Sequence, residues 1–422
     1  MKKVGIALLG LGTVGGGTYR ILTANKERLE KEYGISIEIL KVMERDKEKA
    51  EALGISANIL TTDINDIVSN PEIKIVAEFF GGIEPAKTFL IKSLESGKSI
   101  VTANKELFSK YWQQLEEAAE KGGAGLYFEA TCAGGVPVIR TLNDAMQANN
   151  ITAIKGIING TTNYILSKMS DEGADYKEVL KNAQKLGYAE ANPEADVEGY
   201  DASYKLSILS TLAYKTAVPV NAIYREGITK ISNEDIEFGK EFGLTIKLLG
   251  ISKKSEKGIE ARVHPVFIPE NHPLSSVKGS FNAVYITGDS VDDIMLYGRG
   301  AGDLPTGSAI VSDIIYAAMA EKHKRFPQVL EKGDIQFISD FESEYYLRLL
   351  VNDKPGVLAM LSGILGKYDI SITTMVQKEG DKAVPLCFVT HKTCEKAIQN
   401  AVEEIGKLDD VLEISNIIRV ER

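Results

Sequence analysis

The sequence predicts an α/β protein of more than one domain, in which a doubly wound parallel sheet comes first and a small βαββαβ unit comes last. Short apolar segments alternate with stretches of helical periodicity over the first 135 residues, and this alternation is typical of βαβ units. Longer helical stretches follow, and residues 345–422 then read as strand, helix, strand, strand, helix and strand, the pattern of a ferredoxin-like module. A chain of 422 residues has room for two or three domains.

The individual elements divide the chain into successive regions. Residues 1–135 should hold strands and helices in alternation, with strands predicted at 4–9, 36–46, 74–82, 99–105 and 125–131 and helices at 13–33, 84–96 and 108–121. Residues 136–299 form a predicted α+β domain, with helices at 138–148, 161–173 and 174–187 and strands at 261–268 and 282–288. Residues 300–322 contain an apolar helix that we expect to pack back on the first domain. Residues 323–344 are charged and weakly periodic, as in a linker.

Composition excludes several classes of function. A net charge of −10 disfavours a nucleic-acid partner, because a phosphate-binding surface would oppose the overall field. Two lysines before an apolar run could indicate a secretory signal, but glycines interrupt that run, which disfavours a signal peptide. No segment has the ~20 consecutive apolar residues that a membrane-spanning helix needs. Three cysteines without metal-type spacing and four scattered histidines indicate a reduced, cytoplasmic setting; they are Cys132, Cys387, Cys394, His264, His272, His323 and His391.

A glycine cluster directly follows the first predicted strand. Gly10, Gly12 and Gly15 match G-x-G-x-x-G and stand where a helix begins. In that setting the first glycine permits a tight turn, the second lets the backbone approach a pyrophosphate, and the third lets helix and strand pack closely. The motif therefore predicts a Rossmann-like dinucleotide-binding domain.

The second strand ends in two residues of opposite charge, Glu44 and Arg45. A carboxylate there would bind a ribose hydroxyl, as in NAD, whereas an arginine would receive the 2′-phosphate of NADP. Neighbouring side chains at a strand end point in opposite directions, so only one should face the ribose. The preference between the two cofactors stays open.

Two lysines are candidates for proton transfer. Lys105 follows a predicted strand of the nucleotide domain, at the sheet edge where ligands bind in such folds. Lys205 lies in a helical stretch, four residues after Asp201, so that carboxylate and ammonium share one helix face. Asp201 and Lys205 could equally be an ordinary surface ion pair.

Two further stretches carry chemistry. Acidic side chains crowd the loop before that helix, and beside a lysine they could bind a substrate ammonium; they are Glu190, Glu194, Asp196 and Glu198. Glu129 ends a strand and precedes Cys132, a glycine pair and a proline. Because no histidine lies near Cys132 in the sequence, we interpret it as a structural thiol rather than a nucleophile.

Five separated blocks resemble homoserine dehydrogenase in the form with a C-terminal ACT domain. They are "GLGTVGGG", "VTANKE", "GIINGTTNYIL", "LGYAEANPEADVEGYDASYKLSIL" and "GRGAGDLPTGSAIVSD", in the family's order and across essentially the whole chain. The resemblance implies reversible NAD(P)-dependent interconversion of L-homoserine and L-aspartate 4-semialdehyde, on the route to threonine, isoleucine and methionine. It further implies a cytoplasmic homodimer or homotetramer.

The resemblance also assigns site residues. Lys205 would be the acid/base, with Asp201 and Lys105 in the same active site. Substrate would meet Glu190, Asp196, Asp201 and the turn Asn159, Gly160 and Thr161. Cofactor would meet Gly10, Gly12, Thr13, Val14, Gly15, Glu44, Arg45, Lys105, Gly187 and Gly302. Sodium would be held by the Glu129 carboxylate and by backbone carbonyls at Cys132, Gly134 and Val136; the family usually has an aliphatic residue at position 132.

The resemblance implies an amino-acid effector, threonine, at the first strand-to-helix turn of the ACT domain. The residues concerned are Asn352, Asp353, Gly356, Val357 and Leu358. Two alternatives remain at this point. An aspartate-semialdehyde dehydrogenase would use Cys132 as its nucleophile, and a non-catalytic amino-acid sensor would keep the fold without needing the acid/base lysine.

Overall fold

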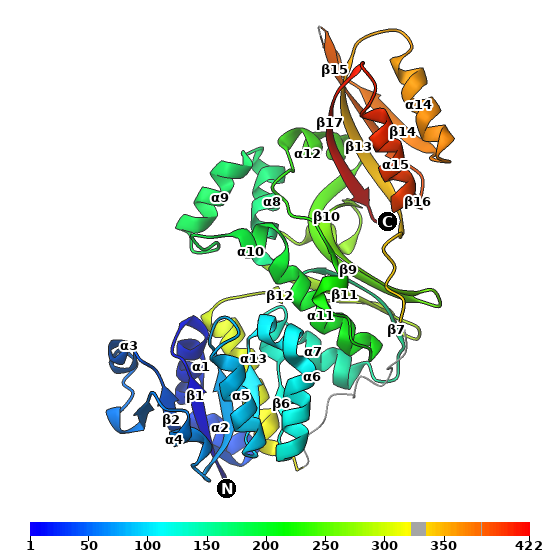
Figure 1. Cartoon of the computed structure of the whole chain (residues 1–422). Helices are drawn as coiled ribbons and strands as arrows, with labels where there is room; N and C mark the ends of the chain where they lie inside the picture. The colour runs from blue at the N-terminus through cyan, green and yellow to red at the C-terminus, as the bar shows by residue number, and fades with distance from the viewer. Residues whose placement is uncertain (322–334, 381) are drawn as a thin grey trace. The chain divides into compact units, whose positions relative to one another are not determined.

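The computed structural model describes residues 1–321, 335–380 and 382–422, which fall into two compact units. Unit 1 contains Met1–Ile154, Asp201–Ile223 and Phe281–Asp334, and unit 2 contains Lys155–Tyr200, Tyr224–Ser280 and Ile335–Arg422. Most of the predicted linker lies outside the described residues, as does His323. Figure 1 traces the elements of both units.

Unit 1 is built on a six-stranded parallel sheet with the order β3-β2-β1-β4-β5-β6. This order reverses direction between β1 and β4, as in a doubly wound nucleotide-binding fold. The predicted Rossmann-like domain is therefore confirmed. Its strands are β1 (Lys2–Leu9), β2 (Ile35–Met43), β3 (Leu60–Thr61), β4 (Ile73–Glu78), β5 (Ser99–Thr102) and β6 (Leu126–Tyr127).

Helices flank this sheet (Figure 1). They are α1 (Thr13–Ala24), α2 (Lys26–Tyr33), α3 (Lys47–Ala52), α4 (Asn65–Val68), α5 (Ala86–Glu95), α6 (Lys105–Gly122) and α13 (Asp303–Met319). The single helix predicted at 13–33 is broken at Asn25, whose side chain bonds back to the Ile21 carbonyl. From α13, Ile310 and Ile314 are buried in the same apolar core as β1.

The remaining elements of unit 1 depart from the prediction in a helix and in two strands, at 151–157 and 292–299, that were not predicted. The helix expected at 138–148 is only α7 (Val138–Arg140) followed by a π turn at Thr141–Ala145. The first backbone N–H groups of this stretch donate to the Glu129 carboxylate, and the Met146 N–H closes the π turn on Thr141. Unit 1 also holds β11 (Phe281–Gly288), β12 (Asp292–Arg299) and all of α11 (Tyr200–Tyr214) except its first residue, whereas β7 (Ile151–Ile157) crosses the unit boundary.

Unit 2 begins with helices and continues into two long antiparallel strands and one short strand that pairs with one of them in parallel. These elements are α8 (Gly160–Glu172), α9 (Tyr176–Lys185), α10 (Glu194–Val197), β8 (Tyr224–Arg225), α12 (Asn233–Glu241), β9 (Leu244–Ser255) and β10 (Gly258–Pro269). Asn159 caps α8 by accepting from Thr162 N, and Ser232 and Asp235 form a reciprocal capping box on α12. The long strand β9 was not among the predicted strands.

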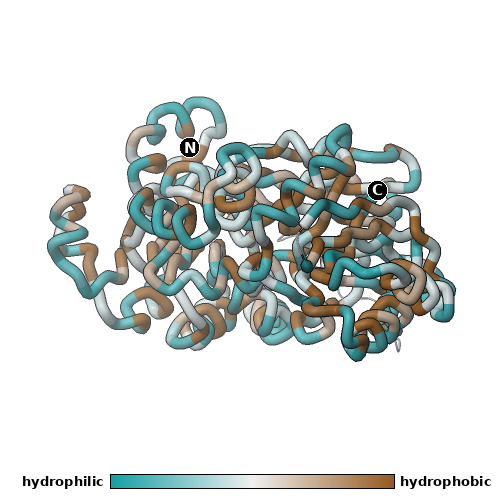
Figure 2. The backbone as a smooth tube through the Cα atoms, turned by 90° about the horizontal axis from the view of Figure 1, so that it is seen from above, coloured by the Kyte–Doolittle hydropathy of each residue, from teal (hydrophilic) through white to brown (hydrophobic). Residues whose placement is uncertain are grey.

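The C-terminal part of unit 2 is the predicted βαββαβ module (Figure 1). It contains β13 (Glu342–Asn352), α14 (Val357–Lys367), β14 (Ile372–Gln377), β15 (Ala383–Thr390), β16 (Thr393–Cys394), α15 (Glu395–Ile405) and β17 (Val411–Val420). The antiparallel order β17-β13-β15-β14 confirms the ferredoxin-like fold, and Leu361, Phe388 and Ile398 are buried in its core. Hydrophobic and hydrophilic stretches alternate along the chain in Figure 2, as expected of elements that bury one face.

Candidate functional site

The glycine loop between β1 and α1 has the backbone geometry that a phosphate site requires. Gly10 has a φ of +99°, and a Cβ at Gly15 would lie 2.3 Å from the Gly10 carbonyl oxygen. A Cβ at Gly12 would meet nothing within 4 Å, so space is open there at the first turn of α1. Backbone N–H groups at the start of a helix attract phosphate, and these residues fit a dinucleotide.

Glu44 faces this loop. Its carboxylate accepts hydrogen bonds from the N–H groups of Leu11 at 2.8 Å, Arg45 at 2.9 Å and Asp46 at 3.0 Å. The Arg45 side chain is exposed beside it. Glu44 therefore holds the glycine loop, and Arg45 is the second residue after the end of β2.

Gly302 is the residue before α13, and its φ of +120° turns the chain into that helix. The helix packs very closely on α1, because a Cβ at Gly17 would lie 2.2 Å from the Asp303 carbonyl oxygen. Gly187, which we predicted to contact cofactor, is exposed with a φ of +76° in the loop after α9. Gly302 thus belongs to unit 1 with the glycine loop, and Gly187 belongs to unit 2.

Asp201 brings both candidate lysines together within unit 1. Lys205 Nζ donates to Asp201 Oδ2 at 2.6 Å, and Lys105 Nζ lies 3.2 Å from Asp201 Oδ1. The Lys205 and Asp201 side chains are only 11% and 9% exposed, so this is not an ordinary surface pair. Lys105 is 42% exposed and reaches the same carboxylate from the first turn of α6.

The turn that places Lys105 depends on two buried residues that sequence reasoning missed. Glu78, the last residue of β4, accepts from Phe80 N at 2.6 Å and from the Thr102 hydroxyl at 2.5 Å. Asn104 caps α6 through Leu107 N and donates to the carbonyls of Phe80 and Gly82. Burial raises the pKa of Glu78 to about 7 despite these hydrogen bonds. An acidic residue ending a buried strand was the signal that could have identified Glu78.

Glu129 forms a second buried cluster in unit 1. Its two carboxylate oxygens accept from the N–H groups of Ile139 and Arg140, each at 2.8 Å. Asp313 accepts from Glu129 N and from the Arg140 guanidinium, each also at 2.8 Å. Burial and the neighbouring Asp313 raise the pKa of Glu129 to about 7, so a cation beside it would stabilise its charged form.

The turn after Glu129 has two successive residues with positive φ. Ala133 and Gly134 both have a φ of +53°, and a Cβ at Gly134 would lie 2.5 Å from the Gly300 carbonyl oxygen. One carboxylate and several carbonyls are the oxygen ligands that hard cations prefer. Among the described residues there is no group of three or more His, Cys, Asp or Glu side chains able to hold a metal.

Cys132 is fully buried, with Sγ 3.7 Å from the Lys205 carbonyl oxygen. Burial raises its pKa to about 12, which disfavours the thiolate that a nucleophile needs. The aspartate-semialdehyde dehydrogenase alternative therefore has no support. Cys132 instead packs under the backbone of α11.

The other predicted substrate residues belong to unit 2. Asn159 Nδ2 donates to Asp196 Oδ1 at 2.7 Å, and the Thr161 hydroxyl donates to the Tyr188 carbonyl at 2.6 Å. A Cβ at Gly160 would lie 2.7 Å from the Ser280 carbonyl oxygen, so only glycine fits there. Glu190 is exposed on the loop after α9.

The predicted effector turn of the ACT domain lies at the start of α14. Gly356 precedes that helix with a φ of +94°, and Asn352 donates to Asp410 at 2.9 Å. Val357 is buried, whereas Asp353 and Leu358 are exposed. The turn thus combines exposed backbone with polar and apolar side chains.

No helix among the residues that the structure describes is long and apolar enough to cross a membrane.

Comparisons with known proteins agree with this geometry along the whole chain. Residues 10–129 match the family model of the homoserine dehydrogenase NAD-binding domain, residues 137–315 match that of homoserine dehydrogenase, and residues 345–410 match that of the ACT domain. Homoserine dehydrogenases of Neisseria gonorrhoeae and Bacillus subtilis are 41% and 38% identical to this chain, each over 100% of it and 99% of the relative.

Solved structures of homoserine dehydrogenases are also similar to this chain. A homoserine dehydrogenase from Thiobacillus denitrificans superimposes with a TM-score of 0.94 at 43% identity, covering 100% of this chain and 99% of that one. A hyperthermophilic archaeal homoserine dehydrogenase in complex with NADPH has a TM-score of 0.65 at 26% identity, covering 77% of this chain and 99% of that one. The sensor alternative is not supported, and the chain is a nicotinamide-dependent oxidoreductase that belongs to the homoserine dehydrogenase family, in the form with a C-terminal ACT domain.

Proposed function

We propose that the protein interconverts L-homoserine and L-aspartate 4-semialdehyde, with Lys205 as the acid/base. The observation that carries this assignment is the Asp201 carboxylate, which contacts both Lys205 and Lys105 in a nearly buried position. Homoserine oxidation requires a group that accepts the hydroxyl proton, and a lysine held by a carboxylate can do so. The nicotinamide cofactor supplies the hydride acceptor when it is bound.

The chain's own residues then have separate tasks. As the neutral amine, Lys205 Nζ takes the hydroxyl proton during oxidation and becomes the ammonium, and in the reverse direction the ammonium gives that proton to the carbonyl oxygen. Asp201 fixes the direction of Nζ through its 2.6 Å hydrogen bond, and Lys105 supplies a second positive charge at the same carboxylate. Asp196 and Glu190 act as counter-charges for the substrate ammonium.

We propose NADP as the preferred cofactor. Three backbone N–H groups already occupy the Glu44 carboxylate, which therefore holds the glycine loop rather than a ribose hydroxyl. Arg45 is exposed next to it and can receive a 2′-phosphate. The archaeal homoserine dehydrogenase solved in complex with NADPH supports this proposal, because NADPH carries the 2′-phosphate.

We propose that Glu129 is a ligand of a bound sodium ion. The Glu129 carboxylate and the backbone carbonyls of Cys132, Gly134 and Val136 would supply an all-oxygen donor set, and a positive ion there would favour the charged form of Glu129, whose pKa burial raises to about 7. Charge relief of this kind would stabilise the turn beneath α11, where Cys132 contacts the Lys205 carbonyl.

We also propose an effector, an oligomeric state and a cellular location for the protein. Threonine is the proposed effector at the turn between β13 and α14, where Gly356 starts the helix in a left-handed conformation. We propose a homodimer or homotetramer, since ACT modules commonly pair across chains. The three cysteines are free thiols, in keeping with a cytoplasmic location.

The test follows the absorbance of reduced cofactor at 340 nm with L-aspartate 4-semialdehyde as substrate. NADPH and NADH are compared, each with and without threonine and with sodium replaced by a larger cation. Turnover with NADPH supports the assignment, whereas cofactor binding without turnover of semialdehyde or homoserine refutes it.

A further inference from the structure

Strand β17 of the ACT domain contacts the middle part of unit 2 through backbone and side chain. It pairs in parallel with β10 at Val266 opposite Arg419 and Phe267 opposite Val420. The Arg419 side chain, only 3% exposed, donates to Glu395 Oε1 at 2.6 Å in the ACT domain. It also donates to Glu226 Oε2 at 2.5 Å and to the Tyr224 hydroxyl at 3.0 Å, outside that domain. One buried cation therefore links two parts of unit 2.

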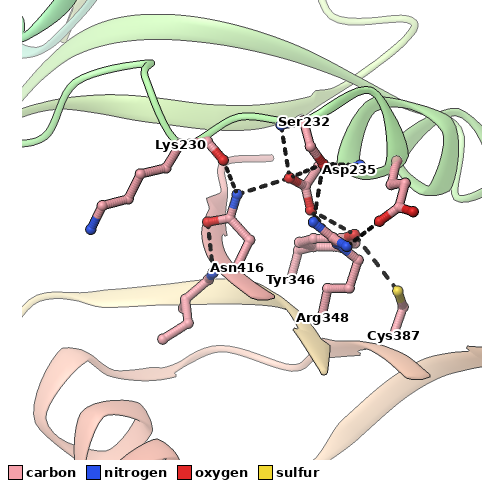
Figure 3. A network of polar contacts seen from close by, with 9 residues as sticks. Lys230, Ser232, Asp235, Tyr346, Arg348, Cys387 and Asn416 are labelled. Carbon is pink, nitrogen blue, oxygen red and sulfur yellow. Dashed lines mark hydrogen bonds and ion pairs between the residues drawn. The ribbon is translucent and has the colours of Figure 1, made fainter. Parts of the chain in front are cut away.

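A second buried charge makes a similar link (Figure 3). The Asp235 carboxylate on α12 is fully buried and accepts from Arg348 Nε at 2.7 Å, the Tyr346 hydroxyl at 3.2 Å and Asn416 Nδ2 at 2.9 Å. These three donors come from β13 and β17. Asn416 Nδ2 also donates to the Lys230 carbonyl at 3.2 Å. Both clusters therefore hold residues 224–235, which we name the bridging segment.

The other side of the bridging segment packs on α10 and the loop after it. Ile228 N donates to the Val197 carbonyl at 2.9 Å, and Arg225 donates to the Glu198 carbonyl at 2.8 Å. The Thr229 hydroxyl donates to Glu198 Oε1 at 3.1 Å. A Cβ at Gly227 would lie 2.5 Å from the Val197 carbonyl oxygen, so the two chain segments are in close contact.

From α10 the contacts continue to a predicted substrate residue. Asp196, one residue before Val197, accepts from Asn159, the cap of α8. The far end of α8 is also held by the bridging segment, because Asn233 Nδ2 donates to the Gly173 carbonyl at 2.8 Å. A displacement of the segment would thus move α10 and α8 together, since close-packed elements transmit strain.

We propose that the bridging segment transmits the docking of the ACT strands to Asp196, so that Arg419 and Asp235 are positioning residues for the amino-acid substrate. The ACT domain then acts on binding of the substrate's amino-acid part and leaves cofactor binding unchanged. This inference rests on the proposed function, because it assigns Asp196 to the substrate. It adds that the C-terminal strand is needed for that binding even without an effector.

The test replaces Arg419 by glutamine in the full-length protein. Loss of the cation leaves Glu226 and Glu395 facing each other without a charge partner, which should release the bridging segment. We expect the KM for homoserine to rise about tenfold, which corresponds to about 1.4 kcal/mol, while the KM for NADPH stays within twofold. Arg419→Lys should restore part of the affinity, because it keeps the charge.

Two further variants separate positioning from folding. Glu226→Gln is a milder change at a partly exposed side chain and should raise the homoserine KM in the same direction. Arg422→Gln is the matched control: it removes an exposed arginine ion pair, with Glu344, at the same chain end without contact to the bridging segment. It should leave both KM values unchanged.

Hydrogen exchange gives a readout that does not depend on turnover. Peptides covering 193–200 and 224–232 should exchange faster in Arg419→Gln than in the wild type and the Arg422→Gln control. A lowered melting temperature with unchanged KM values and unchanged exchange at 193–200 overturns the inference, as does an equal rise of both KM values. If Arg419→Gln exchanges faster than the wild type at 193–200 but the wild type itself does not turn over homoserine, the coupling stands and the proposed function is refuted.

Discussion

Replacing Glu421 by glutamine removes the charge of a carboxylate that three cations surround in unit 2. Glu421 Oε1 lies 2.6 Å from Lys253 Nζ and 3.0 Å from Lys155 Nζ, and Oε2 accepts from Arg262 at 2.9 Å. Burial alone would raise the pKa of this carboxyl, but Lys253, Arg262 and Lys155 lower it to about 2. The C-terminal end of β17 is thereby held against β9 and β10.

The lowered pKa of Glu421 determines how much folding stability Glu421→Gln should lose and how that loss depends on pH. A shift from 4.5 to about 2 corresponds to about 3 kcal/mol at ~1.36 kcal/mol per pH unit. Because the pKa is lower in the folded protein, this stabilisation is complete above pH 4.5 and disappears as the pH falls toward 2. The value agrees with the ~3–5 kcal/mol lost when one partner of a buried ion pair is removed. Glu421→Gln should therefore be about 3 kcal/mol less stable than the wild type at pH 7.

The assay must report on unit 2. The single tryptophan, Trp112, lies in unit 1 and is unsuitable. Peptide-resolved hydrogen exchange over β10 and β17 at pH 7 measures the local opening free energy. Urea titrations followed by circular dichroism at decreasing pH then test whether the difference between variant and wild type narrows below pH 4.5. Glu413→Gln, at an exposed position of the same strand, is the control. Equal stability of Glu421→Gln and wild type at pH 7, or a difference independent of pH, would refute the reasoning.

Three other predictions concern the proposed active site. Lys205→Ala should lower kcat by about 10²- to 10⁴-fold, the usual contribution of a general acid/base, with cofactor affinity by fluorescence titration nearly unchanged; substantial turnover would remove its assigned role. Arg45→Ala should weaken NADPH binding by about 10- to 100-fold, as for a lost charge-assisted hydrogen bond, and leave NADH binding unchanged; equal losses for both cofactors would contradict the assignment. Glu129→Gln should abolish any activation by sodium in initial-rate assays, and sodium activation that persists in the variant would place the ion elsewhere.

Local sequence patterns were sufficient for the parts of the site that depend on neighbours in the chain. Gly10, Gly12 and Gly15 follow a short apolar strand, and their positions require a tight turn and a helix start. Asp201 and Lys205 are four residues apart on a helix, and this spacing alone brings them within hydrogen-bond distance. The ACT module could also be predicted, because each of its strands and helices shows its own hydrophobic periodicity in the sequence.

Tertiary structure decided whatever depends on residues far apart in the chain. No local pattern in the sequence predicts that the Asp201–Lys205 pair is buried or that Lys105 contacts Asp201. The contact between Arg140 and Asp313, which are 173 residues apart, has no local signal either. The helix predicted at 138–148 is helical over 138–145, but its second part is a π turn that Met146 N closes on the Thr141 carbonyl, and the periodicity of the sequence did not predict that turn. Asp235 was not singled out in the sequence, and only the folded chain brings Arg348, Tyr346 and Asn416 to its carboxylate. Helix and strand periods reflect forces between neighbouring residues, whereas burial and charge pairing depend on which distant segments pack together.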